Sequence, residues 1–303
     1  MTPEPSRLDP VMRERRQLLN LAYRMLGSLA DAEDVVQETY ARWYAMPPAQ
    51  RDAVRSPGAW LTKVAGRICL NLLGSARARR ETYVGEWLPE PLPDPSEWLS
   101  GTSAGTDPAD RITLDESVTM AFLVVFESMT PAERVAFVLH DVFRYPFTEV
   151  AEIVGRSPAA CRQLAASARR RATAARATTD PGAERQARVV RRFKAAWESQ
   201  DINALIQLLD PRATAVSDGG GRAMAHPLPL EGAEPIAHFY LRIARFSPPR
   251  TIHERTVNGL PGLAVETDGR IDTVFAFELT TDDRIARIWA VRNPDKLVPW
   301  QVP

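Results

Sequence analysis

Apolar residues recur at helical spacing between residues 29 and 45. This apolar side is supplied by Val35, Val36, Tyr40, Trp43 and Tyr44. Ser28 is a suitable N-cap, Asp31 three positions later completes a capping box, and Pro47 ends the element. The polar residues Asp34, Gln37 and Glu38 lie between these apolar positions and are spaced at i, i+3 and i+4. We therefore expect an amphipathic helix on which these three polar residues share one face.

A second helix is predicted from Ser56 as N-cap and Pro57 as its first residue. Trp60, Val64 and Ile68 repeat every four residues and should be buried. Lys63, Arg67 and Asn71 repeat in the same way one step round the helix, and the basic run "RARR", which contains Arg77, closes it. A basic stripe that carries an amide is suited to DNA, because the cations bind phosphate and asparagine can read a base edge.

Residues 83 to 108, "YVGEWLPEPLPDPSEWLSGTSAGTDP", break both periodicities. The prolines exclude a long helix or strand, so this segment is predicted to be an extended linker. It nevertheless carries Trp87 and Trp98, and a simple tether needs no large aromatic rings. We expect Trp87 to pack against another part of the protein, whereas "GTSAGT" has the composition of a plain tether.

Residues 109 to 176 return to helical patterning. Thr130, Pro131 and Glu133 predict a capped helix start, and a short helix over about 146–154 ends at Gly155. Ser157 and Pro158 start another helix directly, which makes the pattern a helix-turn-helix. The second helix carries Arg162, Gln163, Ser167 and Arg169, with no acid between residues 156 and 176. Arginine and glutamine near the start of such a helix suit guanine and adenine edges in the major groove.

After a boundary at 177–183, residues 184 to 303 predict three helices and then strands. The helices lie in "ERQARVVRRFKAAWESQDINALIQLLD" and "EGAEPIAHFYLRIARF". The strands follow from alternating β-branched residues, with hairpins at Asp268-Gly269 and "TTDD". This order predicts an α+β domain in which a curved antiparallel sheet wraps over helices. The fold class is therefore multidomain, with two all-α domains followed by an α+β domain.

Composition restricts the chemistry. Equal numbers of acidic and basic residues, 38 of each, hide the basic stripes in a neutral total. The two cysteines, Cys69 and Cys161, lie far apart and offer neither a disulfide framework nor zinc spacing. The N-terminus has no apolar signal core, and no run approaches the ~18 apolar residues that span a bilayer. We expect a cytoplasmic protein without membrane contact, cofactor or metal.

Three ordered stretches, "DAEDVVQETYARWY", "SPGAWLTKVAGRICLNLLGSARARR" and "MTPAERVAFVLHDVFRYPFTEVAEIVGRSPAACRQLAASARRR", resemble regions 2 and 4 of bacterial extracytoplasmic-function sigma factors. The tail resembles the SnoaL-like cone domain, an α+β domain fused to one subgroup of them, with that subgroup's "WLPEP", "DGGG" and "NPDKL". The resemblance implies four parts: region 2 (1–82), the linker (83–108), region 4 (109–176) and the SnoaL-like domain (184–303). The resemblance implies that the chain is an alternative sigma factor that binds core RNA polymerase and promoter DNA. It also implies that the tail regulates this activity in cis.

The resemblance also assigns roles to the residues singled out above. It places Asp34, Gln37 and Glu38 on core polymerase, Lys63, Arg67, Asn71 and Arg77 at the minus-10 element, and Arg162, Gln163, Ser167 and Arg169 at the minus-35 element. Gly74 departs from the pattern, because related factors often carry a large polar residue there. Regulatory contacts between the tail and the sigma domains or linker are assigned to Trp87, Leu88, Pro89, Glu90, Pro91, Asp218, Gly219, Gly220, Gly221, Asn293, Pro294, Asp295, Lys296 and Leu297.

Other interpretations remain open. Asp34, Gln37 and Glu38 could form only a solvated face, and the helix-turn-helix could be an ordinary helical hairpin. Three consecutive glycines exceed what one turn needs, so "DGGG" predicts a close backbone approach to a neighbouring domain or a ligand. His238, Tyr240 and Trp289 are candidates to line a cone-domain pocket for a small molecule. The alternative functions are a ligand-sensing DNA-binding regulator that never touches polymerase, and a cone-domain enzyme with a DNA tether; we assign no catalytic residue.

Overall fold

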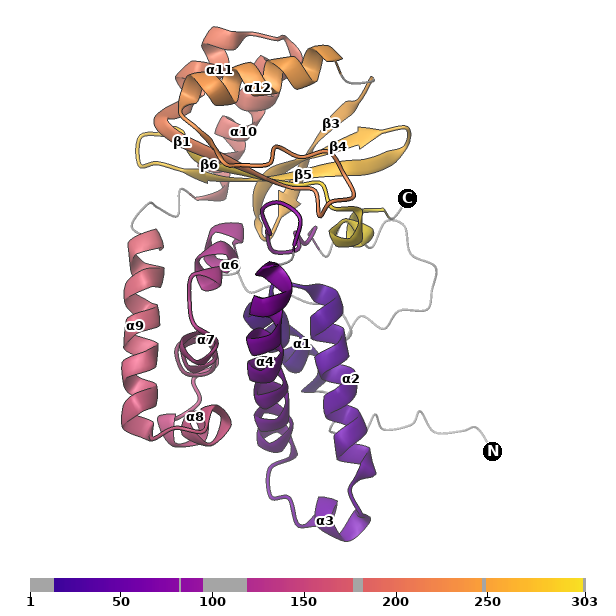
Figure 1. The fold of residues 1–303 in the computed structure, drawn as a ribbon, viewed down its shortest axis with the longest axis vertical. Helices are drawn as coiled ribbons and strands as arrows, with labels where there is room; N and C mark the ends of the chain where they lie inside the picture. The colour runs from indigo at the N-terminus through magenta and orange to yellow at the C-terminus, as the bar shows by residue number, and fades with distance from the viewer. Residues whose placement is uncertain (1–13, 82, 95–118, 177–181, 247–248, 302–303) are drawn as a thin grey trace. The chain divides into compact units, whose positions relative to one another are not determined.

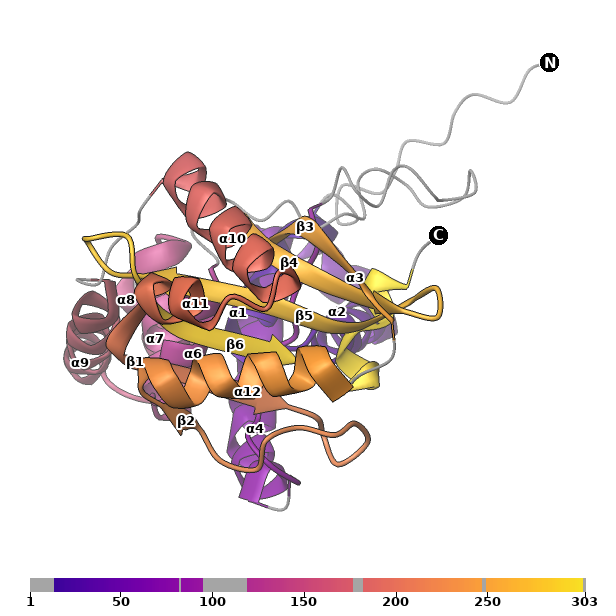
Figure 2. The same cartoon turned by 90° about the horizontal axis from the view of Figure 1, so that it is seen from above.

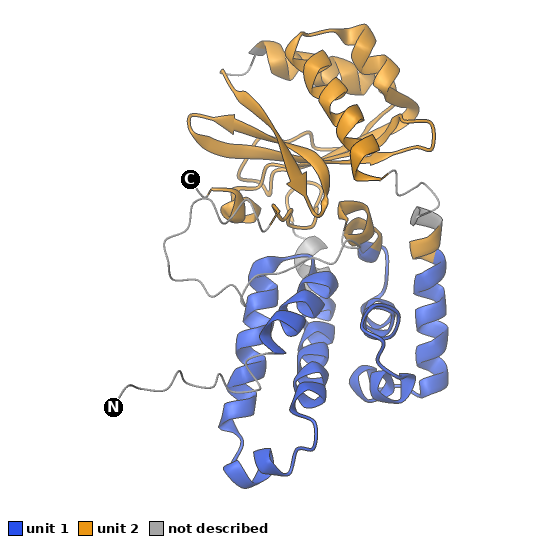
Figure 3. Cartoon of the chain, turned by 180° about the vertical axis from the view of Figure 1, so that it is seen from behind, with its two compact units in different colours: residues 1–78, 103–113, 126–170 blue, residues 79–102, 114–125, 171–303 orange. Residues whose placement is uncertain are grey.

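The computed structural model describes residues 14–81, 83–94, 119–176, 182–246 and 249–301 (Figure 1). The chain forms two compact units (Figure 3). The first comprises residues 1–78, 103–113 and 126–170, and the second comprises residues 79–102, 114–125 and 171–303. The second unit therefore contains the proline-rich linker residues together with the C-terminal domain. Trp98 and the "GTSAGT" segment lie outside the described residues.

The N-terminal part of the first unit is helical, as predicted. Its helices are α1 (Arg15–Leu26), α2 (Leu29–Ala45), α3 (Pro48–Asp52) and α4 (Pro57–Glu81). Gly27 takes a left-handed conformation that ends α1, and the Ser28 side chain accepts a hydrogen bond from the Asp31 N–H to begin α2. Val35, Val36 and Ile68 are buried as predicted. The prediction is wrong for Trp60 and Val64, which are only half-buried, and Tyr44 near the end of α2 is 46% exposed.

The helix-turn-helix is confirmed. α6 (Met120–Glu127) is followed by α7 (Pro131–Phe137), a π-helical turn (Val138–Val142), α8 (Phe147–Val154) and α9 (Pro158–Arg176). Thr130 and Glu133 form the complete capping box predicted for α7. Gly155 ends α8 at φ +71°, and the Ser157 hydroxyl accepts a hydrogen bond from the Ala160 N–H at the start of α9.

Arg134 on α7 is a buried charge that joins separate parts of the first unit. The residue is only 3% exposed. Its guanidinium donates to the carbonyl oxygens of Met25 (2.9 Å) and Phe126 and forms an ion pair with Glu127 (2.8 Å). Burial lowers the pKa of Arg134 to about 10, so it is still charged at neutral pH. The C-terminal end of α1 is thereby tied to α6 and α7.

The second unit is a six-stranded sheet with helices on one face (Figures 1 and 2). The helices are α10 (Ala183–Glu198), α11 (Ile202–Leu208) and α12 (Ala233–Phe246). The strands are β1 (Leu209–Asp218), β2 (Leu230–Glu231), β3 (Thr251–Val257), β4 (Leu260–Thr267), β5 (Arg270–Leu279) and β6 (Ile285–Val291), in the spatial order β2-β1-β6-β5-β4-β3. The sequence predicts the Asp268-Gly269 hairpin correctly, since both residues have positive φ there.

The prediction of an antiparallel sheet is wrong for one pair of strands. β1 and β6 run parallel, while β3 to β6 are antiparallel. The connection from β1 passes through β2 and α12 to β3 at the other edge of the sheet, and three hairpins then bring β6 back beside β1. Pro211 lies inside β1 where the register with β6 shifts, and such an irregularity tolerates a residue without an N–H.

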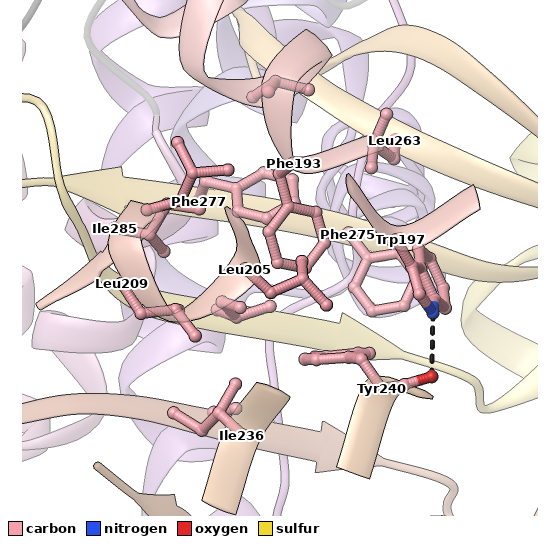
Figure 4. Packing of buried hydrophobic residues seen from close by; sticks show 14 of the residues in the cluster. Phe193, Trp197, Leu205, Leu209, Ile236, Tyr240, Leu263, Phe275, Phe277 and Ile285 are labelled. Carbon is pink, nitrogen blue, oxygen red and sulfur yellow. Dashed lines mark hydrogen bonds between the residues drawn. The ribbon is translucent and has the colours of Figure 1, made fainter. Parts of the chain in front are cut away.

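Both faces of this sheet are buried. The face below α10–α12 carries an aromatic cluster around Phe193, Trp197, Tyr240 and Phe275, in which the Trp197 indole N–H donates to the Tyr240 carbonyl at 2.9 Å (Figure 4). Side chains alternate along β6, so Ile288 and Ala290 face this cluster. On the opposite face, Trp289 and Val291 pack with Leu88, Leu297 and Trp300. The helix-free face is therefore covered by the linker and the C-terminal residues.

Candidate functional site: polar helix faces and a linker-binding site

The predicted polar face of α2 is present. Asp34, Gln37 and Glu38 are all exposed, and the residues between them, Val35 and Val36, are buried. Glu38 forms an ion pair with Arg42 one turn later at 2.9 Å. The helix thus presents two carboxylates and an amide on one side, which is a surface suited to a partner with basic and polar groups.

The basic stripe on α4 is also exposed, at Lys63, Arg67 and Asn71. The structure adds a contact that the sequence did not indicate. The Lys63 ammonium binds the Glu152 carboxylate of α8 at 2.5 Å, and the Arg67 guanidinium donates to the Glu152 carbonyl oxygen at 2.9 Å. Hydrogen bonding and charge from Lys63 lower the pKa of Glu152. Both side chains of the ion pair are largely exposed, so a competing phosphate can replace Glu152 at little cost.

The remaining two positions on α4 differ. Gly74 is exposed, and a Cβ added there would meet no atom within 4 Å. Nothing in the fold therefore requires glycine at this position. Arg77 belongs to α4, but its side chain lies outside the described residues.

The second helix of the helix-turn-helix, α9, exposes Arg162, Gln163 and Arg169, whereas Ser167 is half-buried. The Arg162 guanidinium lies 5.6 Å from the centre of the Phe147 ring, at the start of α8. Arg169 forms an ion pair with Asp141 at 2.5 Å. Arg162 and Gln163 are thus exposed near the N-terminal end of α9. In helix-turn-helix proteins, this end of the second helix contacts base edges.

The linker is bound within the second unit by two charged residues of the C-terminal domain. Asp218, at the end of β1, is fully buried, and its carboxylate accepts hydrogen bonds from the Tyr83 hydroxyl (2.6 Å), the Leu88 N–H (2.9 Å) and the Lys296 ammonium (2.7 Å). Burial raises the pKa of Tyr83 well above its usual range, and the hydrogen bond to Asp218 adds a smaller effect in the same direction. We call Asp218, Lys296, Asn258 and Trp300 the linker-binding site.

Lys296 gives Trp87 its partner. The Lys296 ammonium lies 4.1 Å from the centre of the Trp87 ring and 5.2 Å from that of Tyr83, and it also donates to the Leu88 carbonyl. A cation above an aromatic face is attracted by the ring quadrupole, more strongly when water is excluded. Lys296 is buried, so "NPDKL" contributes a desolvated charge that holds Tyr83 and Trp87 of the linker.

Backbone and apolar contacts complete the linker-binding site. The Asn258 N–H donates to the Leu92 carbonyl at 2.8 Å, the Leu92 N–H donates to the Asn258 side chain at 3.3 Å, and the Trp300 indole donates to the Pro91 carbonyl at 2.8 Å. Leu88 and Leu92 are each 3% exposed. Residues 89 to 91 of "WLPEP" are buried as well. Nothing local in the sequence indicates that Asn258 or Trp300 binds the linker; the Asn258-Gly259 pair predicts only a hairpin.

The glycines of "DGGG" are required by close packing. Gly220 has φ +59°, and a Cβ there would overlap the Asn293 side-chain amide and lie 2.9 Å from the Tyr83 hydroxyl. A Cβ on Gly221 would lie 3.0 Å from Val84. The close backbone approach predicted for this motif is therefore an approach to the linker and to Asn293, which itself donates to Tyr83 at 2.9 Å.

Gly220→Ala is expected to destabilise the second unit more than Gly269→Ala. Both glycines have positive φ, which costs an alanine about 1–2 kcal/mol, but only Gly220 also faces a steric overlap, worth about 1–3 kcal/mol more. Urea denaturation monitored by tryptophan fluorescence measures the difference. Gly269, with open space around its Cβ position, is the matched control. Equal losses in the two variants would contradict tight packing of "DGGG" on the linker.

The pocket prediction needs correction. The aromatic face of the sheet borders a cavity of about 570 Å³ whose walls include Tyr240, Trp197, Phe275, Arg250 and Arg292. His238 is exposed and lines a separate surface hollow on α12. Trp289 does not line either cavity, because the alternation along β6 turns it to the opposite face.

Two residues singled out from the sequence, Asp218 and His238, are not among the residues that line the cavity at the aromatic face of the sheet. Asp218 binds the linker, and His238 lies on the exposed side of α12. Within the described ranges, no group of three or more His, Cys, Asp or Glu side chains could hold a metal ion. None of the helices that the structure describes has the length and apolar character needed to cross a bilayer.

Two family models match the chain. The Sigma-70 region 2 model matches residues 11–79, and the Sigma-70 region 4 model matches residues 119–171. The first range contains α1 to α4 except for the last residues of α4, and the second contains α6 to α8 and α9 except for its last residues.

Relatives match over nearly the whole chain. The ECF RNA polymerase sigma factor SigJ of Mycobacterium tuberculosis is 37% identical over 93% of this chain and 90% of its own length. The probable ECF RNA polymerase sigma factor SigI of the same species is 33% identical, with 97% of each chain covered. The crystal structure of SigJ matches with a TM-score of 0.74 at 33% identity and covers 96% of this chain and 98% of that one.

Proposed function

The chain belongs to the extracytoplasmic-function RNA polymerase sigma factors, and from this premise we propose how its surfaces divide the work of transcription initiation. As an alternative sigma factor it binds core RNA polymerase and directs it to promoters. This assignment of roles is supported by three exposed polar faces, on α2, α4 and α9. They occur in this order within the ranges that match regions 2 and 4.

Region 2 supplies two of these faces. Asp34, Gln37 and Glu38 on α2 bind core polymerase, where carboxylates and an amide meet basic and polar groups of the large subunit. Lys63, Arg67 and Asn71 on α4, with Arg77, contact the minus-10 element and help to hold bases that leave the stack. Promoter phosphates replace Glu152 on Lys63, since that exposed ion pair is weak.

Region 4 reads the minus-35 element with α9. Arg162 and Gln163 reach base edges in the major groove, because they stand exposed near the N-terminal end of the second helix of a helix-turn-helix. Ser167 and Arg169 lie further along α9 and bind the phosphate backbone, for which Arg169 exchanges Asp141 for a phosphate.

The C-terminal domain regulates the factor in cis by holding the linker. In the working complex the linker runs along polymerase, so the same residues cannot also occupy the linker-binding site. Because the domain is covalently attached, its effective concentration at the linker is about millimolar, and modest contacts suffice to keep the linker bound. A signal changes activity only by its differential affinity for the bound and released arrangements. We assign the domain no catalytic activity and place the factor in the cytoplasm with its polymerase.

In-vitro transcription with purified core polymerase and genomic DNA of the source bacterium tests the assignment. The full chain is expected to initiate transcripts at defined start sites. The variant Asp34→Ala/Gln37→Ala/Glu38→Ala should lose about tenfold or more of core binding and transcription, the effect of removing several charge-assisted contacts.

The control variant Gln50→Ala/Asp52→Ala removes an exposed amide and an exposed acid from α3 and should keep full activity. Circular dichroism checks that both variants are folded. Wild-type protein that binds DNA but never core polymerase would overturn the sigma-factor function in favour of a DNA-binding regulator. Full activity of the triple variant would overturn the assignment of the α2 face.

A further inference from the structure

We propose that the cavity between the sheet and α12 binds a small organic anion with an apolar, aromatic body, and that Arg250 and Arg292 hold its anionic group. This inference goes beyond the proposed function and does not depend on it. The cavity volume of about 570 Å³ lies in the range of small-molecule sites.

The cavity is apolar and aromatic on its inner side. Trp197, Tyr240 and Phe275 contribute to the wall, and their rings pack edge to face with centroids 5.3–5.8 Å apart (Figure 4). The Trp197 indole N–H already donates to the Tyr240 carbonyl, so the ring needs no partner from a ligand. Burial raises the pKa of the Tyr240 phenol far above neutrality and keeps it uncharged. Such a wall favours a planar apolar body.

Arg250 brings an incompletely satisfied charge to this wall. Its guanidinium lies 5.0 Å from the centre of the Trp197 ring, and its buried Nη2 has no hydrogen-bond partner among the described residues. Burial lowers the pKa of Arg250, and Arg292 adds to this effect while Asp272 opposes it. A buried donor left unpaired is costly, so an anion that accepts from Nη2 would gain binding free energy.

Arg292 supplies the second cation. Its Nε donates to the Thr273 hydroxyl at 3.2 Å, and its Nη1 donates to the Met224 carbonyl. The Thr273 hydroxyl in turn donates to Asp272 at 2.7 Å. The cavity-lining residues include Arg242 as well, so three arginines face one carboxylate, Asp272. The lining therefore carries net positive charge, which disfavours cations, and a neutral apolar ligand would leave Arg250 unpaired.

Arg250 is the better position for mutation, because Arg292 is close to the linker-binding site. The backbone N–H groups of Arg292 and Asn293 both donate to the Asp218 carbonyl, at 2.7 and 2.9 Å. Changing Arg292 would thus disturb linker contacts along with the cavity. Arg250→Met keeps an unbranched apolar stem and removes the charged end, and Arg250→Gln keeps a polar end without charge.

A matched pair of fluorescent probes tests the proposal on the full chain. 8-Anilinonaphthalene-1-sulfonate carries an aromatic body and one anionic group, and N-phenyl-1-naphthylamine has the same body without charge. The sulfonate is expected to bind at one saturable site and more tightly than the amine. Arg250→Met and Arg250→Gln should weaken sulfonate binding about tenfold or more, the loss of a charge-assisted hydrogen bond, and change amine binding less than about threefold.

Arg212→Met is the control. The Arg212 side chain is 94% exposed and does not line the cavity, so removal of its charge should leave both affinities unchanged. Thermal melting without probe is the second measurement: Arg250→Met should melt at or above the wild-type temperature, because it removes an unpaired buried donor. The proposal is overturned if wild type binds both probes equally, if it does not bind the sulfonate, or if Arg212→Met and the Arg250 variants weaken sulfonate binding alike.

Discussion

Lys296→Met is expected to lower the free energy of unfolding of the second unit by about 3–5 kcal/mol, because it leaves the Asp218 carboxylate buried without its cation. Asp218 is fully buried, and the hydrogen bonds from Tyr83 and Leu88 do not neutralise its charge. The same change removes the cation from the Trp87 ring and the donor from the Leu88 carbonyl. The linker should therefore leave its site more readily.

Lys194→Met is the matched control, since Lys194 forms an exposed ion pair with Glu198 one turn away on α10, worth only about 0.3–0.5 kcal/mol. Urea denaturation measures stability, and hydrogen exchange of the Leu88 and Leu92 amides measures release of the linker. The double variant Asp218→Asn/Lys296→Met should recover part of the loss, because no unpaired charge remains. Equal losses for Lys194→Met and Lys296→Met would rule out a strong charged contact at the linker.

The same variants test regulation in cis. If the bound linker restrains the factor, Lys296→Met should raise promoter-specific transcription at a fixed concentration of folded protein. The assay is run below the temperature at which the variant melts. Unchanged or lower transcription from protein with a released linker would count against the C-terminal domain as an inhibitor that acts through the linker.

Arg134→Met is expected to destabilise the first unit by a similar amount, about 3–5 kcal/mol. The substitution removes the ion pair between Arg134 and Glu127, and the Met25 and Phe126 carbonyl oxygens lose a buried donor. These groups belong to the end of α1 and to the end of α6, so the loss should affect the whole unit and not only α7.

Thermal denaturation followed by helical circular dichroism measures this effect. Arg42→Met is the control, because Arg42 and Glu38 are both about half exposed and their i,i+4 ion pair contributes little. A drop in melting temperature for Arg134→Met no larger than that for Arg42→Met would show that the buried guanidinium does not join these helices.

Local signals were sufficient for the helix-turn-helix. Thr130, Glu133 and Gly155 act on backbone groups within one turn of themselves, so their sequence pattern predicts the structure directly. The exposed faces on α2 and α4 follow in the same way from helical spacing. The Asp268-Gly269 hairpin is equally local, because the residues at its centre need positive φ.

Contacts between distant segments could not be predicted in this way. The parallel pairing of β1 with β6 depends on where the chain crosses the sheet, and the face occupied by Trp289 depends on the register of β6. The contact of Lys63 and Arg67 with Glu152 joins two helices that each look solvent-exposed in isolation. Arg250 carries no motif, and only the folded cavity shows that its Nη2 lacks a partner.

The sequence by itself determined the order of the modules, the helix ends at Ser28, Thr130 and Gly155, the polar helix faces and the presence of unusual residues in the linker, because each depends on neighbours within a few positions. Only the tertiary structure decided what those unusual residues contact. Tyr83 and Asp218 are separated by 135 positions, and Asp218 and Lys296 by 78. Burial of a charge is favourable only where its partner is brought within hydrogen-bond distance. That placement gives Trp87 of the linker its partner, Lys296 of the linker-binding site.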